Sequence, residues 1–190
     1  AEINTERRRA IVSNHSATHL MHSALRNILG EHVQQKGSLV NEEKLRFDFS
    51  HKQKLSESEI VKIEQEVNQA IVSAEDTEII ETSIEESQKL GAIAFFGEKY
   101  GDQVRVLKIA GDYSTELCGG THVKNSSEIK SFKIISETSI SSGVRRIEAI
   151  SGDLAIKDKA DNKTDLLNTA ETFNVSVKIL PTCLLYTSDA

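Results

Sequence analysis

One helical segment near the N-terminus, residues 8–29, constrains the fold of this chain more than any other feature. Its apolar residues recur at the spacing of a single helix face, and Gly30 is placed to end the helix. A second stripe, formed by His15, His19 and His22, lies almost opposite the centre of the apolar face. The histidines are therefore not simply core residues of the packing face. We expect this helix to have a packing partner on each side.

The segments that follow predict a mixture of strands and helices. Residues 33–40 and 44–50 are expected to pair as a hairpin around a turn at 41–43. Ser56 and Glu59 have the spacing of a capping box ahead of a second amphipathic helix. Further strands are predicted at 77–83, 104–110, 129–136 and 143–151, with a short helical stretch within 84–97. Because strands and helices do not alternate regularly, we expect an α+β fold in which one mixed, largely antiparallel sheet packs with two long helices.

The chain is predicted to hold one core followed by a helical extension. A length of 190 residues suits a single domain, which we assign to residues 1–152. Residues 153–180 are polar and helical in pattern, as expected of a linker that leads towards a C-terminal domain. Residues 181–190 contain the only proline and resemble translated vector sequence, so they are excluded from the functional interpretation. Without an initiator Met, the chain is interpreted as a fragment.

Composition and charge narrow the functional classes. A net charge of −6 argues against a protein whose main role is to neutralise nucleic-acid phosphates. The basic groups at 7–9 and 145–146 are expected to be mainly solvated or salt-bridged, with phosphate contact as the alternative. No apolar run approaches the roughly 18 residues of a membrane span, and no secretory signal is present. Two distant cysteines, Cys118 and Cys183, make a disulfide framework implausible, so we expect a cytoplasmic protein.

Two short motifs predict a metal site. His15 and His19 are four residues apart on a helix, which brings both imidazoles to one face. Residues 118–122, CGGTH, place a thiolate and an imidazole on either side of two glycines that permit a tight turn. The predicted ligands are His15, His19, Cys118 and His122. Mixed thiolate and imidazole ligation favours zinc over magnesium or calcium. Four protein ligands normally fill all four positions of a tetrahedral zinc ion, so the sequence is compatible with a structural zinc site as well as with a catalytic one.

The remaining histidines and nearby carboxylates are less informative. His22 is interpreted as a satisfied histidine rather than a ligand, because four better-spaced ligands already exist. His32 and His51 have no ligand partner nearby in the sequence. Asp112 and Glu116 precede the cysteine motif, and either is interpreted equally well as a solvated loop charge or as a general base. The sequence therefore identifies no general base.

Longer segments resemble the editing domain of alanyl-tRNA synthetases. They are NHSATHLMHSALRNILGEHVQQKGSLV, LRFDFSH, FGEKYGDQVRVLKIAGDYSTELCGGTHV and SGVRRIEAISG. The resemblance covers nearly all of residues 8–152, whereas the two ligand motifs alone also occur in freestanding alanyl-tRNA editing proteins and in threonyl-tRNA synthetases. It implies one zinc ion per chain, held by the four predicted ligands. It also implies that Thr18 and Gln35 line the pocket for the aminoacyl group.

The resemblance implies an aminoacyl-tRNA ester hydrolase that acts on the acceptor end of tRNA(Ala) carrying misattached serine or glycine. Such a site is needed because a pocket for alanine excludes these two amino acids poorly. If Thr18 or Gln35 binds the serine hydroxyl, alanine would leave a buried polar group unpaired and would be spared. Backbone N–H groups of Gly119 and Gly120 are candidate donors to the oxyanion.

The parent synthetase is expected to ligate alanine to tRNA(Ala) with ATP and Mg2+, which would bind in a catalytic domain upstream of this chain. Zinc would either lower the pKa of a bound water or orient the ester and its terminal ribose, and four ligands favour orientation. Two other interpretations remain: a freestanding trans-editing deacylase, and a non-catalytic tRNA-binding module in which zinc only stabilises the fold. The polar helix after Gly152 favours the synthetase over the freestanding protein.

Overall fold

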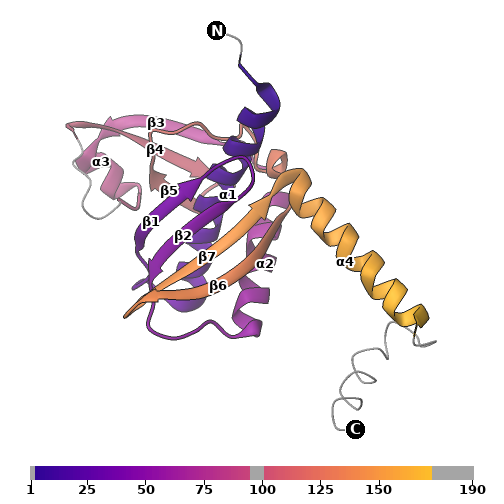
Figure 1. Cartoon of the computed structure of the whole chain (residues 1–190). Helices are drawn as coiled ribbons and strands as arrows, with labels where there is room; N and C mark the ends of the chain where they lie inside the picture. Colours follow the sequence, from indigo (N-terminus) through magenta and orange to yellow (C-terminus); the bar gives the residue numbers. More distant parts are fainter. Residues whose placement is uncertain (1–2, 95–100, 173–190) are drawn as a thin grey trace. The chain divides into compact units, whose positions relative to one another are not determined.

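The computed structural model of the chain describes residues 3–94 and 101–172 (Figure 1). The chain divides into two compact units, Ala1–Ala155 and Ile156–Ala190. Helix α4 (Gly152–Thr172) begins in the first unit and continues into the second, where the sequence predicted a helix. Cys183 and the predicted tail at 181–190 lie outside the described residues. No helix in the described part is long and apolar enough to cross a membrane.

Helix α1 (Thr5–Leu29) confirms the long N-terminal helix. The Asn4 side chain accepts a hydrogen bond from the Arg7 N–H at its start, which satisfies one of the unpaired amide groups of the first turn. Gly30 ends the helix with φ of +113°, a backbone conformation that side chains rarely adopt. From residue 16 to 25 every α1 side chain is buried, so the helix is covered on both sides as expected.

The strands form two antiparallel sheets, so the expected single sheet is wrong. The first sheet has the order β1-β2-β7-β6 and the second β3-β4-β5 (Figure 1). Their bounds are β1 Gln35–Val40, β2 Leu45–Ser50, β3 Glu78–Ser83, β4 Gln103–Ile109, β5 Ser114–Leu117, β6 Phe132–Ser141 and β7 Val144–Ser151. The predicted hairpin is β1–β2, and the other four predicted strands are present. Strand β5 was not predicted, because four residues of largely polar sequence carry no clear alternation.

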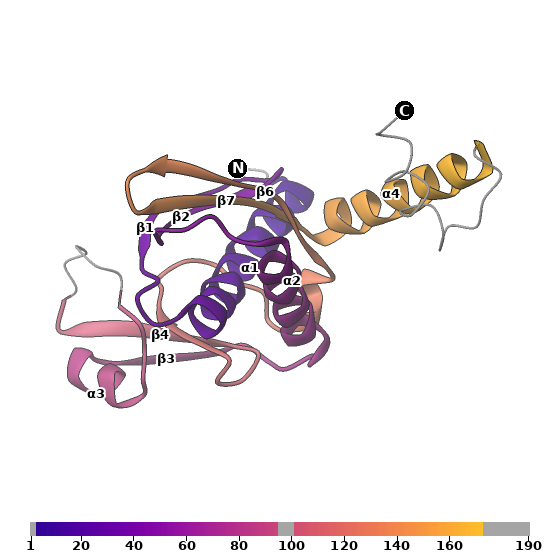
Figure 2. The ribbon, with the colours of Figure 1, turned by 90° about the horizontal axis from the view of Figure 1, so that it is seen from below.

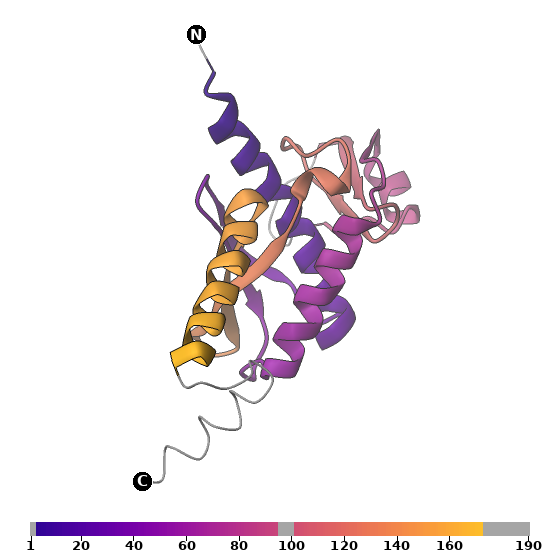
Figure 3. The same cartoon turned by 90° about the vertical axis from the view of Figure 1, so that its right-hand side faces the viewer.

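Helices α1 and α2 (Glu57–Val72) lie between the two sheets of the first unit (Figure 2) and run side by side (Figure 3). Ser56 and Glu59 form the predicted capping box at the start of α2. The main core joins fully buried side chains of α1, α2 and the first sheet, including Leu20, Ile63 and Phe47. A short helix α3 (Ile84–Lys89) and a 3-10 turn η1 (Ser126–Ile129) complete the described elements. Helix α1 therefore contacts both sheets, and its histidines face the second one.

Candidate metal centre

Four side chains predicted to bind metal converge where α1 meets the loop after β5. His15 and His19 come from α1, while Cys118 and His122 come from the loop, and their donor atoms all lie within 4.8 Å of one another. The Cys118 Sγ is 3.6 Å from the His15 Nε2 and 3.3 Å from the His122 Nε2. Tetrahedral zinc with ordinary bond lengths would separate sulfur and nitrogen ligands by about 3.6 Å. The donor set and its spacing therefore fit zinc.

The two glycines of the loop have different roles. At Gly120 an added Cβ would collide with the His15 ring and would lie 3.4 Å from the His122 Nε2, so only glycine admits both ligands here. The Gly120 N–H donates to the Cys118 Sγ at 3.4 Å. At Gly119 a Cβ would meet nothing within 4 Å. The expected oxyanion role does not hold for Gly120, because its N–H is directed at the thiolate, whereas Gly119 lines the neighbouring cavity.

Glu116 is not a solvated loop charge. It lies on β5 with 1% of its surface exposed, and its Oε2 accepts from the His19 Nδ1 at 2.5 Å. Its Oε1 accepts from the His22 Nδ1 at 2.7 Å. The sequence contains one indication that Glu116 faces the metal donors. Residues two apart on a strand share a face, and Glu116 precedes Cys118 by two residues. That indication depends on recognising β5 as a strand.

Burial and charge at the centre favour the protonation states that bind metal at Cys118 and His122, but not at His19. Burial raises the pKa of the Cys118 thiol, but hydrogen bonds from His122 and His15 outweigh burial and hold the pKa at about 3. Cys118 is thus a thiolate, which is the form that binds metal. Burial lowers the pKa of His122 to about 4, so its imidazole is neutral. Burial also opposes a proton on His19, yet Glu116 and Cys118 raise its pKa, so a metal ion would displace a proton there.

A cavity of about 400 Å³ adjoins three of the four donors. Its walls include the predicted ligands His15, His19 and Cys118, together with Thr18 and Gln35. Ser38, Gln103, Val104, Arg105 and Leu117 also line the cavity and were not predicted. β1, β4 and β5 bring these residues to the site, and that placement depends on strand pairing rather than on a motif. None of the described residues that line the cavity is an aspartate or a glutamate.

Thr18 is nearly buried, with 4% of its surface exposed. Its Oγ1 donates to the Asn14 carbonyl oxygen at 2.8 Å, as β-hydroxyl groups on helices often do. The single hydroxyl hydrogen is therefore already used. Towards the cavity, Thr18 is left with acceptor capacity only.

The other histidines and Asp112 lie apart from the four donors. His22 is buried, donates from its Nδ1 to Glu116, and has its ring centroid 5.2 Å from that of Phe47, so it lies in the core beside the four donors rather than among them. His32 and His51 are joined by a hydrogen bond of 2.9 Å between their Nε2 and Nδ1 atoms. Asp112 is solvated and pairs with Lys108 on the surface.

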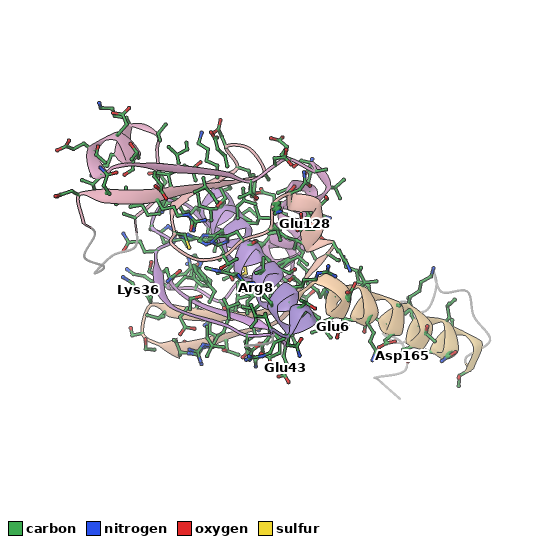
Figure 4. All side chains as sticks on the ribbon, turned by 90° about the horizontal axis from the view of Figure 1, so that it is seen from above. Glu6, Arg8, Lys36, Glu43, Glu128 and Asp165 are labelled. Carbon is green, nitrogen blue, oxygen red and sulfur yellow. The ribbon has the colours of Figure 1, made fainter. Side chains whose placement is uncertain are left out.

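The predicted basic groups are largely held in ion pairs. Arg145 pairs with Glu137, and Arg146 binds both carboxylate oxygens of Asp48 at 2.7 and 2.8 Å. Arg8 lies on the exposed first turns of α1 (Figure 4). The ordinary, salt-bridged interpretation therefore holds for the pair at 145–146.

Comparison with known sequences places this site in context. Residues 104–148 match the family described as the threonyl and alanyl tRNA synthetase second additional domain. The alanine–tRNA ligase of Alkaliphilus metalliredigens is 60% identical over 81% of this chain, which corresponds to 17% of that protein. Those of Alkaliphilus oremlandii and Xanthomonas axonopodis pv. citri are 52% and 53% identical over 94% and 89% of the chain. The chain spans 17–20% of the length of these relatives.

Proposed function

Because this chain is homologous over most of its length to one segment of alanine–tRNA ligases, we propose that it is their editing domain and hydrolyses mischarged tRNA(Ala). One observation carries the proposal: three of the four clustered metal-type donors, His15, His19 and Cys118, form part of the wall of a cavity of about 400 Å³. A purely structural zinc site needs no adjoining cavity. The proposed substrates are tRNA(Ala) molecules whose acceptor end carries serine or glycine in place of alanine.

The polar groups of the cavity suit a serine side chain. The serine hydroxyl would donate to the Thr18 Oγ1, which has acceptor capacity only, and would accept from the side-chain amide of Gln35. An alanyl group makes neither bond and leaves both polar groups unsatisfied, which disfavours its binding. The proposal for glycine rests on the family resemblance alone.

His15, His19, Cys118 and His122 would hold one zinc ion at the end of the cavity. A bound zinc ion supplies Lewis-acid charge beside the ester and its terminal ribose. Because four protein ligands would leave zinc no open tetrahedral position for water, we assign the site to positioning the substrate rather than to activating a nucleophile. The Gly119 N–H remains the candidate donor to the developing oxyanion.

No protein carboxylate is assigned as general base. Glu116 has both oxygens bound to histidines and does not line the cavity, and the described lining contains no carboxylate. Ligation of alanine with ATP and Mg2+ is proposed for other domains of a longer synthetase. The cytoplasmic location predicted from the cysteine content belongs to the same proposal.

Single-turnover deacylation with excess protein tests the function. The zinc-loaded chain should release serine from Ser-tRNA(Ala) and spare Ala-tRNA(Ala) in a matched reaction. Excess protein compensates for weak binding by an isolated domain that carries a net negative charge. If the folded, zinc-loaded chain binds the tRNA but leaves both esters intact, the non-catalytic tRNA-binding module becomes the better account.

A further inference from the structure

One buried carboxylate joins two turns of α1 to β5 beside the metal donors. Glu116 accepts a hydrogen bond from the His19 Nδ1 with one oxygen and from the His22 Nδ1 with the other. These histidines lie three residues apart on α1, so they present their rings to the same side of the helix. We propose that Glu116 is a positioning residue that fixes the His19 ring for metal binding, and that His22 in turn orients Glu116.

The argument begins with the two nitrogens of the His19 ring. Either nitrogen of a neutral imidazole binds a metal, and the hydrogen bond made by one nitrogen decides which is used. A carboxylate at Nδ1 requires the hydrogen to be there, which leaves the Nε2 lone pair to face the other donors. Glu116 therefore selects both the tautomer and the ring orientation of His19, as carboxylates behind zinc-binding histidines generally do.

Burial of Glu116 shows that its placement is specific. Only 1% of its surface is exposed, and a carboxylate in such a position is costly unless it is strongly hydrogen-bonded. Two charge-assisted hydrogen bonds at 2.5 and 2.7 Å offset that cost. Glu116 also lies two residues before Cys118, so β5 and the residue directly after it supply both a ligand and the group that orients another ligand.

The inference rests on the proposed zinc site, but its test does not require hydrolysis. Zinc affinity would be measured by chelator competition on the whole chain, and cobalt absorption would report the ligand geometry. Glu116→Gln should bind zinc about 10- to 100-fold more weakly and alter the cobalt spectrum. Asp112→Asn removes an exposed carboxylate four residues away and should leave both readouts unchanged.

If Glu116→Gln does not fold, two substitutions of His22 test the proposal instead. His22→Gln retains an N–H donor for Glu116 and should keep zinc affinity near that of the unsubstituted chain. His22→Leu removes the donor and should weaken zinc binding, because Glu116 then loses one of its two anchors. Equal zinc affinity in these two variants would overturn the role of His22.

Other outcomes separate the alternatives. Unchanged zinc affinity and an unchanged cobalt spectrum in Glu116→Gln would overturn the proposal, even if the metal-free protein melts at a lower temperature, because Glu116 would then only link α1 to β5. Loss of deacylation at saturating zinc, with unchanged zinc affinity and an unchanged cobalt spectrum, would also overturn the proposal, because Glu116 would then act on the substrate site rather than on the metal. A wild-type chain that binds zinc but never deacylates would refute the proposed function and leave this inference standing.

Discussion

Replacement of Gly120 by alanine tests the metal centre with a single methyl group. The new Cβ would lie 2.9 Å from the His15 Nδ1 and closer still to the neighbouring ring carbon. Ordinary van der Waals contact begins at 3.4 Å, so the ring or the loop must shift by at least 0.5 Å. Metal-ligand distances tolerate only about 0.2 Å. His15 is able to rotate away from the methyl group, but its nitrogen then leaves the donor cluster.

Mutation of a group that hydrogen-bonds a metal ligand typically weakens metal binding by about 10- to 100-fold. We expect Gly120→Ala to weaken zinc binding by at least as much, because it displaces a ligand itself. Gly119→Ala is the matched control, because its Cβ would meet nothing within 4 Å and neither glycine has a positive φ. Chelator competition and elemental analysis on both purified variants measure the difference. If Gly120→Ala binds zinc as tightly as Gly119→Ala, the claim that only glycine at position 120 admits the His15 ring is refuted.

Four further substitutions and a core control extend the test. Cys118→Ala and His122→Ala should each lose most of the bound zinc on dialysis, and full occupancy in both would refute the ligand assignment. Gln35→His should slow serine release from Ser-tRNA(Ala) while zinc content and the melting curve stay unchanged; an unaltered rate would remove Gln35 from the pocket. His15→Ala should abolish deacylation, while the variant still unfolds cooperatively. If zinc only stabilises the fold, the variant should instead lose both its bound metal and its stability. Phe47→Ala should lower the free energy of unfolding by about 3–5 kcal/mol in denaturant titrations, and a smaller loss would contradict full burial in one core.

Local patterns account for what the sequence predicted correctly. Helix α1, the β1–β2 hairpin and the Ser56 capping box each depend on residues close together in the chain. The four metal-type donors were also found from spacing, because one pair lies on a helix and the other within a tight loop. Thr18 and Gln35 came from the family resemblance, and the structure places both on the cavity wall.

The features that sequence analysis missed depend on distant pairing. Glu116 is 97 residues from His19 and 94 from His22, and nothing local marks it as buried. The separation into two sheets likewise follows from which strands pair, not from the strands themselves. The histidine stripe predicted that His19 is not simply a core residue, but only 3% of its surface is exposed in the structure and it bonds to the buried Glu116. His15 is only partly buried and is therefore the better residue for separating catalysis from stability.

The loop that carries Cys118 and His122 is held at both ends by protein contacts. At its start, the Cys118 N–H donates to the Arg105 carbonyl oxygen, and the Arg105 Nη1 donates back to the carbonyl oxygens of Cys118 and Gly120 at 3.3 and 2.5 Å. At its end, the Val123 N–H donates to the hydroxyl oxygen of Ser16 on α1 at 3.1 Å. A zinc ion that serves only the fold supplies the free energy that orders its ligands. Here hydrogen bonds from β4 and α1 also hold the ligand loop, so the fold itself supplies contacts that order the loop, in addition to any contribution from a bound metal ion.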